Sequence, residues 1–446
     1  MRFMVNGDSV LIIGSGGREH ALAWLMAKSD GVGKIYTAPG NPGTKQVGEN
    51  VNISANDFDA LVDFALKKKI DLVITGSESQ LGKGIVDIFQ KNGINIYGPN
   101  QQMAQIEIDK IYGKEIMIKA GISTPQHWIF KDPEAAKAKI MEDPKNTVVK
   151  HPSGDMGGKG VHPCATQEEA LAEVDKMFEI TDTVVIEQFA GEKGVIHEEA
   201  SCMVICSGLS YIPLLFSQDH KKEGEGDTGS NTGGMGAYAP CEITRGYEDW
   251  ILEKIVKPTL KVLNGKFFGT LYIALIRNPG DDIWPFQVLE YNARFGDPEL
   301  QPIATLLDAP NFYQILKTSA QQEDLSNFEL KWHPGSAICT VMANKGYPRK
   351  DDYYKSLLGT RILGLDDPYF KNPWVTVFHA GSGFNEKGEL IVAGGRTLNV
   401  TTRGKDIIEA HERCLEALSK IKCDALRYRR DIGYRDIARF KARTGR

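Results

Sequence analysis

Two side chains that suit a magnesium ion stand two positions apart in the segment 287–299, QVLEYNARFGDPE. If residues 286–291 form a strand, Glu290 and Asn292 point to the same face of it. Mg²⁺ usually takes only one or two protein carboxylates and fills its coordination with phosphate oxygens and water. Arg294 follows on the same side and offers a planar fork for a phosphate or carboxylate. The segment therefore predicts a metal-phosphate centre in preference to a solvated strand face.

Two lysines flank a glycine-rich segment at 150–161, KHPSGDMGGKGV. Such a loop can fold over a polyphosphate and donate backbone N–H groups, while Lys150 and Lys159 neutralise charge. It is not a P-loop, because Gly160 follows the lysine where Ser or Thr is required. A flexible hairpin is the alternative if the segment is taken alone.

A third segment joins QDHKK at 218–222 to GDTGSNTGGMG at 226–236. Its many glycines argue against a regular element and let the backbone approach a ligand closely. The interleaved Asp, Asn, Thr and Lys side chains can bind hydroxyls and phosphates. A ligand-binding loop is favoured over a solvated linker, because linkers are seldom so mixed in polar chemistry.

The turn GSGGRE at 14–19 lies between a predicted strand and a predicted helix, where N–H groups and the helix dipole attract anions. A dinucleotide fingerprint would need glycine where Glu19 stands, and an acid after the second strand, where 38–41 reads APGN. NAD binding is therefore disfavoured. A phosphate or small anion is expected, with an empty tight turn as the alternative.

The elements that must position these segments follow from apolar patterning. Short apolar runs alternate with helical spacing up to residue 100 and predict a doubly wound parallel α/β sheet. A helix over 103–120 leads to a small α/β unit, and strand-rich α+β sequence follows. The expected strands are 10–13, 34–37, 72–75, 94–97, 148–150, 184–186, 201–206, 211–216, 271–276, 286–291, 337–342, 375–378 and 398–400. The other expected helices are 58–66, 166–179, 247–263 and 406–419.

The totals exclude several classes of protein. A chain of 446 residues predicts three or four domains, and the net charge of −5 argues against a nucleic-acid surface. The seven cysteines include no C-x-x-C pair, which indicates neither a zinc site nor a disulfide framework. No apolar run approaches the roughly 18 residues of a membrane span, and the first residues lack a signal-peptide layout. A cytoplasmic protein without a membrane partner is expected.

Together these segments closely resemble the phosphoribosylamine–glycine ligase (glycinamide ribonucleotide synthetase) family of the ATP-grasp superfamily. The resemblance runs from GSGGREHA to YRRDIGYRD. QDHK with GDTGSNTGGMGAYAP is its most specific part, followed by LEYNARFGDPELQ; PGNPGT, VFHAG and GYP also match. It implies an N-terminal α/β domain at 1–106, an ATP-grasp domain at 107–332 with a lid subdomain at about 124–192, and a C-terminal α+β domain at 333–446.

The resemblance implies an enzyme of purine biosynthesis that ligates glycine to 5-phosphoribosylamine, with ATP and Mg²⁺ (or Mn²⁺), through a glycyl phosphate. Positioning and charge neutralisation carry phosphoryl transfer, so no Ser or Cys nucleophile is needed. The alternative enzyme is another ATP-grasp carboxylate–amine ligase. A nucleotide-binding regulator with a degenerate site is disfavoured by the intact Glu290, Asn292, Lys150 and Arg294. A monomer or weak dimer is expected.

The resemblance also assigns residues by position. ATP is expected at Lys110, Lys150, Lys159, Glu187, Gln188, Phe189 and Glu199, and the metal at Glu290 and Asn292. The acceptor is expected at Gly16, Gly17, Arg18, Glu19, Asn41, Asp219, Asp227, Asn231, Gly234, Arg294 and Asp297. Catalytic roles are expected for Arg294, Lys221 and Asp219, with Asp219 or Asp297 as a base and Glu78 or Asp297 in the glycine pocket.

The chain departs from the family pattern around the nucleotide. The lid loop is one residue longer than the usual K-A-D-G-L-A-A-G-K-G-V, residues 191–198 are additional, and DKIY at 109–112 replaces S-K-A-F. Which of Glu198 and Glu199 meets the ribose stays open. The strand at 271–276 offers no second metal carboxylate, so a lighter metal site than in many ATP-grasp enzymes is expected.

Overall fold

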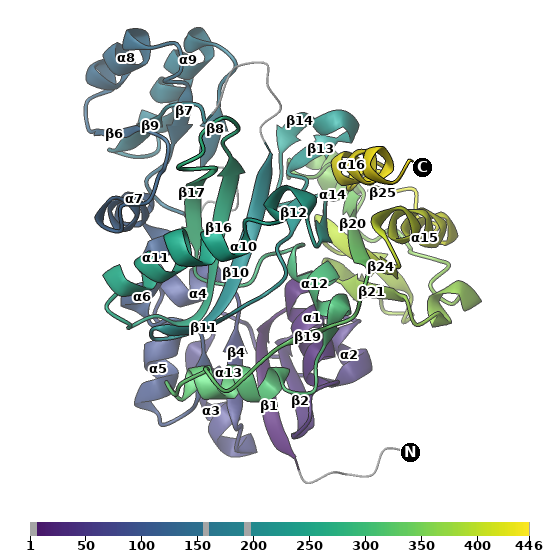
Figure 1. Ribbon diagram of the computed structural model, residues 1–446. Helices are drawn as coiled ribbons and strands as arrows, with labels where there is room; N and C mark the ends of the chain where they lie inside the picture. Colours follow the sequence, from purple (N-terminus) through teal and green to yellow (C-terminus); the bar gives the residue numbers. More distant parts are fainter. Residues whose placement is uncertain (1–6, 155–159, 191–197, 446) are drawn as a thin grey trace.

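The computed structural model describes residues 7–154, 160–190 and 198–445. Its N-terminal part is a five-stranded parallel sheet in the order β3-β2-β1-β4-β5 (Figure 1). The strands are β1 (Asp8–Gly14), β2 (Val32–Pro39), β3 (Glu49–Asn50), β4 (Leu72–Thr75) and β5 (Ile96–Tyr97). The apolar run of β1 is fully buried, as expected for a strand covered on both faces. The predicted doubly wound sheet is confirmed.

Helices connect these strands: α1 (Gly17–Met26), α2 (Thr44–Val47), α3 (Phe58–Lys68), α4 (Glu78–Gly82) and α5 (Ile85–Lys91). Helix α1 begins three residues after β1 ends, which places the Gly16–Glu19 turn at the carboxyl edge of the sheet. In a doubly wound sheet this edge is where ligands bind.

The single helix expected over 103–120 is two helices, α6 (Gln101–Ile108) and α7 (Lys110–Lys119). Asp109 between them has extended backbone, and its Oδ1 accepts the N–H groups of Ile111 (2.9 Å) and Tyr112 (3.2 Å). Asp109 is therefore the N-cap of α7, and this cap explains the break. As a result Lys110 lies at the first position of a helix.

The lid subdomain has a sheet in the order β6-β9-β7-β8 covered by two helices, in the upper left of Figure 1. Its elements are β6 (His127–Phe130), α8 (Pro133–Glu142), β7 (Val148–Lys150), β8 (Val161–Pro163), α9 (Gln167–Phe178) and β9 (Val184–Glu187). It has its own small hydrophobic core, in which Ile140 and Val174 from the helices pack on Val149 and Ile186 from the sheet.

The second sheet is antiparallel, in the order β11-β10-β16-β17. It contains β10 (Glu199–Ser207), β11 (Ser210–Pro213), β16 (Phe268–Arg277) and β17 (Phe286–Asn292), and the expected β16–β17 hairpin is confirmed. The helix expected over 247–263 is continuous but changes pitch: α10 (Glu248–Ile251), a π-helical stretch η3 (Leu252–Val256) and α11 (Lys257–Val262). Helices α12 (Leu300–Leu306) and α13 (Phe312–Ala320) were not anticipated.

The third large sheet combines strands from distant parts of the chain. Its order is β12-β15-β20-β24-β21, with β25 also paired to β20. Strands β12 (Gln218–Asp219) and β15 (Gly236–Ala239) come from the acceptor segment, whereas β20 (Ser336–Asn344), β21 (Val375–His379), β24 (Arg396–Gly404) and β25 (Leu426–Arg427) follow residue 333. This sheet therefore fixes the acceptor segment directly to the C-terminal part.

Helices α15 (Ile407–Lys420) and α16 (Tyr434–Thr444) lie beside this sheet, at the right of Figure 1. The remaining elements are β13 (Lys222–Gly224), η1 (Glu225–Asp227), β14 (Thr228–Asn231), η2 (Glu242–Thr244), β18 (Leu307–Asp308), β19 (Lys331–Trp332), α14 (Asp352–Ser356), η4 (Pro368–Lys371), β22 (Ser382–Phe384) and β23 (Leu390–Val392). Within the described ranges, no helix combines the length and apolarity that crossing a bilayer would require.

Candidate active site

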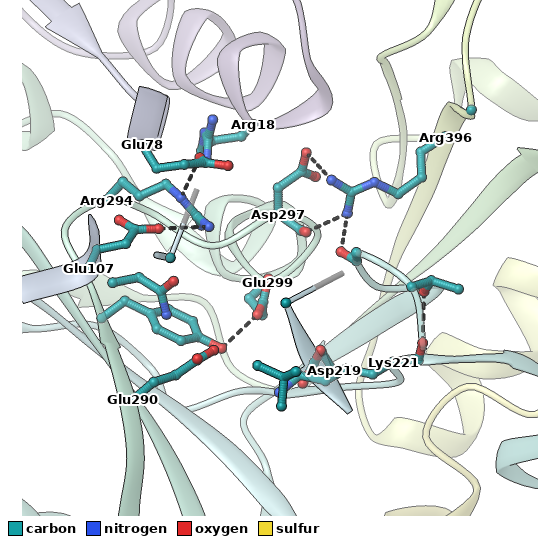
Figure 2. A pocket seen from close by; sticks show the side chains of 18 of the residues that line it. Arg18, Glu78, Glu107, Asp219, Lys221, Glu290, Arg294, Asp297, Glu299 and Arg396 are labelled. Carbon is teal, nitrogen blue, oxygen red and sulfur yellow. Dashed lines mark hydrogen bonds and ion pairs between the residues drawn. The ribbon is translucent and has the colours of Figure 1, made fainter. Parts of the chain in front are cut away.

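A cavity of about 600 Å³ lies where the three large sheets meet (Figure 2). The N-terminal domain contributes Arg18 and Glu78, the antiparallel sheet contributes Glu290 and Asn292, and the C-terminal sheet contributes Arg396. Further lining side chains include Glu107, Lys110, Asp219, Lys221, Tyr272, Arg294, Asp297 and Glu299. Charged and titratable side chains concentrated in one concave site indicate a functional site.

The two residues predicted to bind the metal lie on β17, as their spacing predicts. Glu290 and Asn292 both line the cavity, whereas the Tyr291 hydroxyl lies on the other side, 2.8 Å from Thr259 Oγ1. Two oxygen donors on one strand face fit Mg²⁺. No group of three or more His, Cys, Asp or Glu suited to a metal occurs in the described ranges. The donor set fits a metal whose remaining ligands are phosphate oxygens and water.

Lys110 is paired with this carboxylate, since its Nζ lies 2.8 Å from Glu290 Oε2. Burial alone would raise the pKa of Glu290, but Lys110, Lys221 and Lys150 outweigh it and hold the pKa well below its usual range. Burial likewise opposes the charge on Lys110, and Glu290 overrides it and raises the lysine pKa. Both groups are therefore charged at neutral pH.

A second cluster of lysines surrounds Glu187, which is 2% exposed. Lys150 Nζ lies 2.6 Å from Glu187 Oε2, and Lys114 Nζ lies 3.0 Å from Oε1. Burial lowers the pKa of Lys114 to about 8. Lys114 was not anticipated from the sequence, although it lies four residues after Lys110 on α7 and such residues share a helix face.

The predicted adenine hinge is held by backbone hydrogen bonds to the lid. The Gln188 N–H donates to Gln126 O (2.9 Å), and the Phe189 N–H donates to Lys145 O (2.6 Å). Phe189 and Glu199 line a second cavity of about 470 Å³, where Glu199 is paired with Lys221. Lys159 lies outside the described residues.

Arg294 is held between two carboxylates, as Figure 2 shows. Its Nε donates to Glu78 Oε2 at 3.0 Å, and its Nη2 lies 3.1 Å from Glu107 Oε1. Burial opposes the charge on Glu78, but Arg294 and Arg18 outweigh it and hold the pKa of Glu78 at about 2. For the more deeply buried Glu107, burial dominates and raises the pKa. Glu107 was missed, because it reads as one more polar residue of helix α6.

Arg396 of β24 was also missed. Its Nη2 lies 3.1 Å from Asp297 Oδ2, its Nη1 donates to Asp297 O at 2.5 Å, and it also donates to the carbonyl of Gly233. It therefore ties the glycine-rich acceptor loop to the segment that follows β17. No local pattern marks Arg396, since its partners lie far away in the sequence.

The carboxylate of Glu19 is hydrogen-bonded to other residues of the Gly16–Glu19 turn. Glu19 Oε2 accepts the Gly16 N–H at 2.7 Å, and Oε1 accepts from Arg18 Nε at 2.8 Å. A Cβ at Gly17 would lie 2.0 Å from Asn399 Nδ2, so glycine is needed for α1 to pack on the C-terminal sheet. Of this turn, Arg18 is the residue that lines the cavity.

The structure does not bring Asn41 to the cavity. The side chain is 5% exposed and donates to Ser15 O and His379 O, both at 2.9 Å. Its Oδ1 accepts the N–H groups of Gly43 and Thr44. These bonds connect the N-terminal turn to the end of β21.

Asp219 and Lys221 line both cavities and so lie between them. Burial raises the pKa of Asp219 to about 7, with Glu299 and Glu199 adding to the effect and Lys221 opposing it. Asp227 and Asn231 line the second cavity, where Asp227 is bound by Arg429 (2.8 Å) and Arg435. Gly234 has a φ of +105° and lies against Pro298, which glycine alone tolerates easily.

An antiparallel sheet with Glu290 and Asn292 on its cavity face, beside a small lid sheet that carries Lys150, is typical of the ATP-grasp class of protein. The chain belongs to the phosphoribosylglycinamide synthetase family. The family models match in three parts: the N domain at 8–107, the ATP-grasp (A) domain at 108–300 and the C domain at 337–435. The chain is therefore a ligase of this family.

Individual relatives agree over nearly their whole length. The chain is 38% identical over 440 residues to phosphoribosylamine–glycine ligase of Nostoc sp., covering 96% of this chain and 99% of the relative. It is 40% identical over 442 residues to the enzyme of the same name from Vibrio parahaemolyticus, covering 96% and 99%.

Solved structures show the same fold. The crystal structure of phosphoribosylamine–glycine ligase from Thermotoga maritima superposes with a TM-score of 0.78 at 29% identity, covering 95% of this chain and 100% of that one. The biotin carboxylase domain of the Hydrogenobacter thermophilus 2-oxoglutarate carboxylase, crystallised with MgADP and bicarbonate, has a TM-score of 0.70 at 16% identity, covering 94% and 91%. The latter likeness concerns the fold alone.

Proposed function

We propose that this chain ligates glycine to 5-phosphoribosylamine in purine biosynthesis, forming glycinamide ribonucleotide, ADP and phosphate through glycyl phosphate. One observation carries the proposal. A single cavity joins the Glu290–Asn292 pair to Asp219 and Lys221 of the acceptor segment. Phosphoryl transfer and amine attack can therefore occur in one place. The family membership and the names of the relatives support the same reaction.

The first step makes glycine electrophilic. A carboxylate repels an incoming amine, whereas an acyl phosphate has a good leaving group. Lys110, Lys150 and Lys221 neutralise the phosphates of ATP, and Arg294 orients an anionic group. Glu290 and Asn292 would hold Mg²⁺, which when bound supplies positive charge to the phosphate oxygens. The remaining ATP contacts are proposed at Lys159, Glu187, Gln188, Phe189 and Glu199.

The second step breaks the acyl–phosphate bond. The amine nitrogen of phosphoribosylamine attacks the carbonyl carbon, phosphate leaves, and the amine loses one proton. Asp219 is suited to accept that proton, because burial raises its pKa to about 7. Asp297 is less suited to be the base, since Arg396 and Arg18 outweigh burial and lower its pKa. The acceptor contacts are proposed at Gly16–Glu19, Asp227, Asn231, Gly234, Arg294 and Asp297, with Glu78 or Asp297 at glycine. Asn41 is not among them, because its side chain is bonded to the backbone away from the cavity.

We also propose the domain boundaries 1–106, 107–332 and 333–446, with the lid at about 124–192. A cytoplasmic location fits the seven cysteines, which are all free thiols in the described structure. A monomer or weak dimer is the proposed state.

The test is ADP release by the purified chain with phosphoribosylamine and one carboxylate at a time: glycine, alanine, β-alanine or bicarbonate. We expect release with glycine that depends on phosphoribosylamine, and background release with the others. Equal release with several carboxylates would overturn the assignment to glycine. Release that does not need phosphoribosylamine would overturn the acceptor.

A further inference from the structure

Two consecutive acids stand at the start of β10, Glu198 and Glu199. Glu199 pairs with Ile276 of β16, and the Glu198 carbonyl accepts the N–H of Arg277 at 2.8 Å, so both residues are in the ladder between these strands. Successive side chains of a strand point to opposite faces. Only one of the two carboxylates can therefore face the nucleotide cleft.

Glu199 is the acid on the cleft side. It lines the second cavity together with Phe189 and Asp219, and it is paired with Lys221. Both ion-pair partners are about one third exposed, so a ligand can reach the carboxylate. A carboxylate beside the predicted hinge suits the two hydroxyls of a ribose, because it accepts hydrogen bonds and donates none.

Glu198 is held on the opposite side by the C-terminal helix. Arg439 of α16 is bonded to Glu198 Oε1 and donates to Asp436 Oδ1 at 2.6 Å. The other oxygen of Asp436 accepts the Glu242 N–H at 2.6 Å. Arg439 therefore joins the start of β10, helix α16 and the segment after β15 at one point.

We infer that Arg439 is a positioning residue for the nucleotide: by holding the Glu198 side chain, it fixes the chain at the start of β10 and so presents Glu199 to the ribose hydroxyls. The inference rests on the proposed function. The Glu198 side chain is 15% exposed, so loss of its partner leaves a mostly buried carboxylate that gains by turning toward water. Such a turn at the end of a strand displaces the neighbouring Glu199.

The test compares the binding of ATP and 2′,3′-dideoxy-ATP, each with Mg²⁺, by calorimetry on the full chain. The native enzyme is expected to bind ATP about tenfold or more tightly than the dideoxy analogue, because hydrogen bonds from hydroxyls to a carboxylate are strong. Arg439→Ala should reduce this ratio of affinities several-fold, mainly by weakening the binding of ATP. Glu199→Gln should abolish most of the preference for ATP. The double variant, Arg439→Ala with Glu199→Gln, should lose no more of this preference than Glu199→Gln alone.

Arg443→Ala is the matched control. Arg443 lies one turn further along α16 and pairs with Glu242 at the surface, so its variant should keep the native ratio. Glu198→Gln removes the same ion pair without removing the arginine, and it should behave like Arg439→Ala even if that variant folds poorly. Arg439→Lys should restore part of the ratio.

A folded Arg439→Ala or Glu198→Gln protein with the native ratio would overturn the inference. So would an Arg443→Ala protein that loses the ratio equally, because the effect would then belong to the helix as a whole. Binding is measured without turnover, so the proposed function fails separately, through absence of glycine-dependent ADP release.

Discussion

Lys110 Nζ lies 2.8 Å from Glu290 Oε2, so the lysine expected at the phosphates is bound to the carboxylate expected at the metal. Lys150 is paired with Glu187 and Lys221 with Glu199 in the same way. Each of these cations therefore has an acid as its partner. Binding of a metal nucleotide would exchange one set of ion pairs for another instead of introducing uncompensated charge.

Glu290→Gln is expected to reduce ligase turnover by about 100-fold or more, because the metal loses its charged protein ligand. Raising the Mg²⁺ concentration should recover part of the activity. The measurement is ADP release as a function of Mg²⁺, with the thermal midpoint as a check on folding. Glu253→Gln, at an exposed pair with Lys257, is the control. Native turnover in the Glu290 variant would show that the metal lies elsewhere.

Asp219→Asn tests the acid with the raised pKa. Because the folded pKa of about 7 exceeds the usual aspartate pKa of 3.8, Asp219 keeps its proton to higher pH in the folded state. Its contribution to stability is therefore full below about pH 4 and is lost as the pH rises through about 7. The Asn variant does not undergo this loss, so its thermal midpoint should rise relative to that of the native protein between about pH 4 and about pH 7.

The same variant tests the role of the acid in catalysis. If Asp219 accepts the amine proton, the native kcat/KM for phosphoribosylamine rises as the pH passes about 7. Asp219→Asn should lower the plateau and flatten this limb of the profile. An unchanged profile would remove Asp219 from the proton transfer and leave the amine to bind unprotonated.

Arg294→Met leaves Glu107, which is 6% exposed, without its cationic partner. Removing one member of a buried ion pair costs about 3 kcal/mol, so a clear fall in the free energy of unfolding is expected in urea titrations. Arg294→Met with Glu107→Gln should recover part of that loss, because the buried charge is gone. Activity should stay low in both proteins, since the anion-binding fork is absent.

Asp227→Ala addresses the acceptor loop. Asp227 accepts from Arg429, which is 1% exposed, and from Arg435, so its loss loosens the loop and costs roughly 2 kcal/mol of stability. We expect the KM for phosphoribosylamine to rise several-fold while the KM for ATP stays near the native value. Glu225→Ala, which removes an exposed pair with Arg430, is the control and should change neither constant. An equal rise in both KM values would contradict a specific role at the acceptor.

Predictions from the sequence succeeded where the positions of side chains follow from a local pattern of residues. The two-residue spacing of Glu290 and Asn292 predicted a shared strand face, and both side chains line the cavity. The apolar run of β1 predicted a strand buried on both faces, and it is one. Such features depend only on the period of a strand or helix.

Features that depend on distant contacts were missed. Arg396 lies on β24, 99 positions after its partner Asp297 in the chain. Nothing near Arg396 in the sequence indicates that partner. Glu107 accepts the N–H of Ala293, just after β17, and nothing near Glu107 in the sequence indicates that partner. The glycines predict an irregular acceptor loop, and this prediction is wrong: its ends form β12 and β15, which pair with each other and, for β15, with β20, and its interior forms the β13–β14 hairpin.

The mixed origin of the C-terminal sheet bears on how the protein is made. Strand β15 ends at Ala239, and its neighbour β20 starts at Ser336, so roughly 100 residues separate their emergence from the ribosome. At about 5–20 residues per second, β15 waits on the order of 5–20 s with an open edge. A nascent chain paused in this interval offers an unpaired strand to other chains, and this is the stage of synthesis at which a chaperone would matter most.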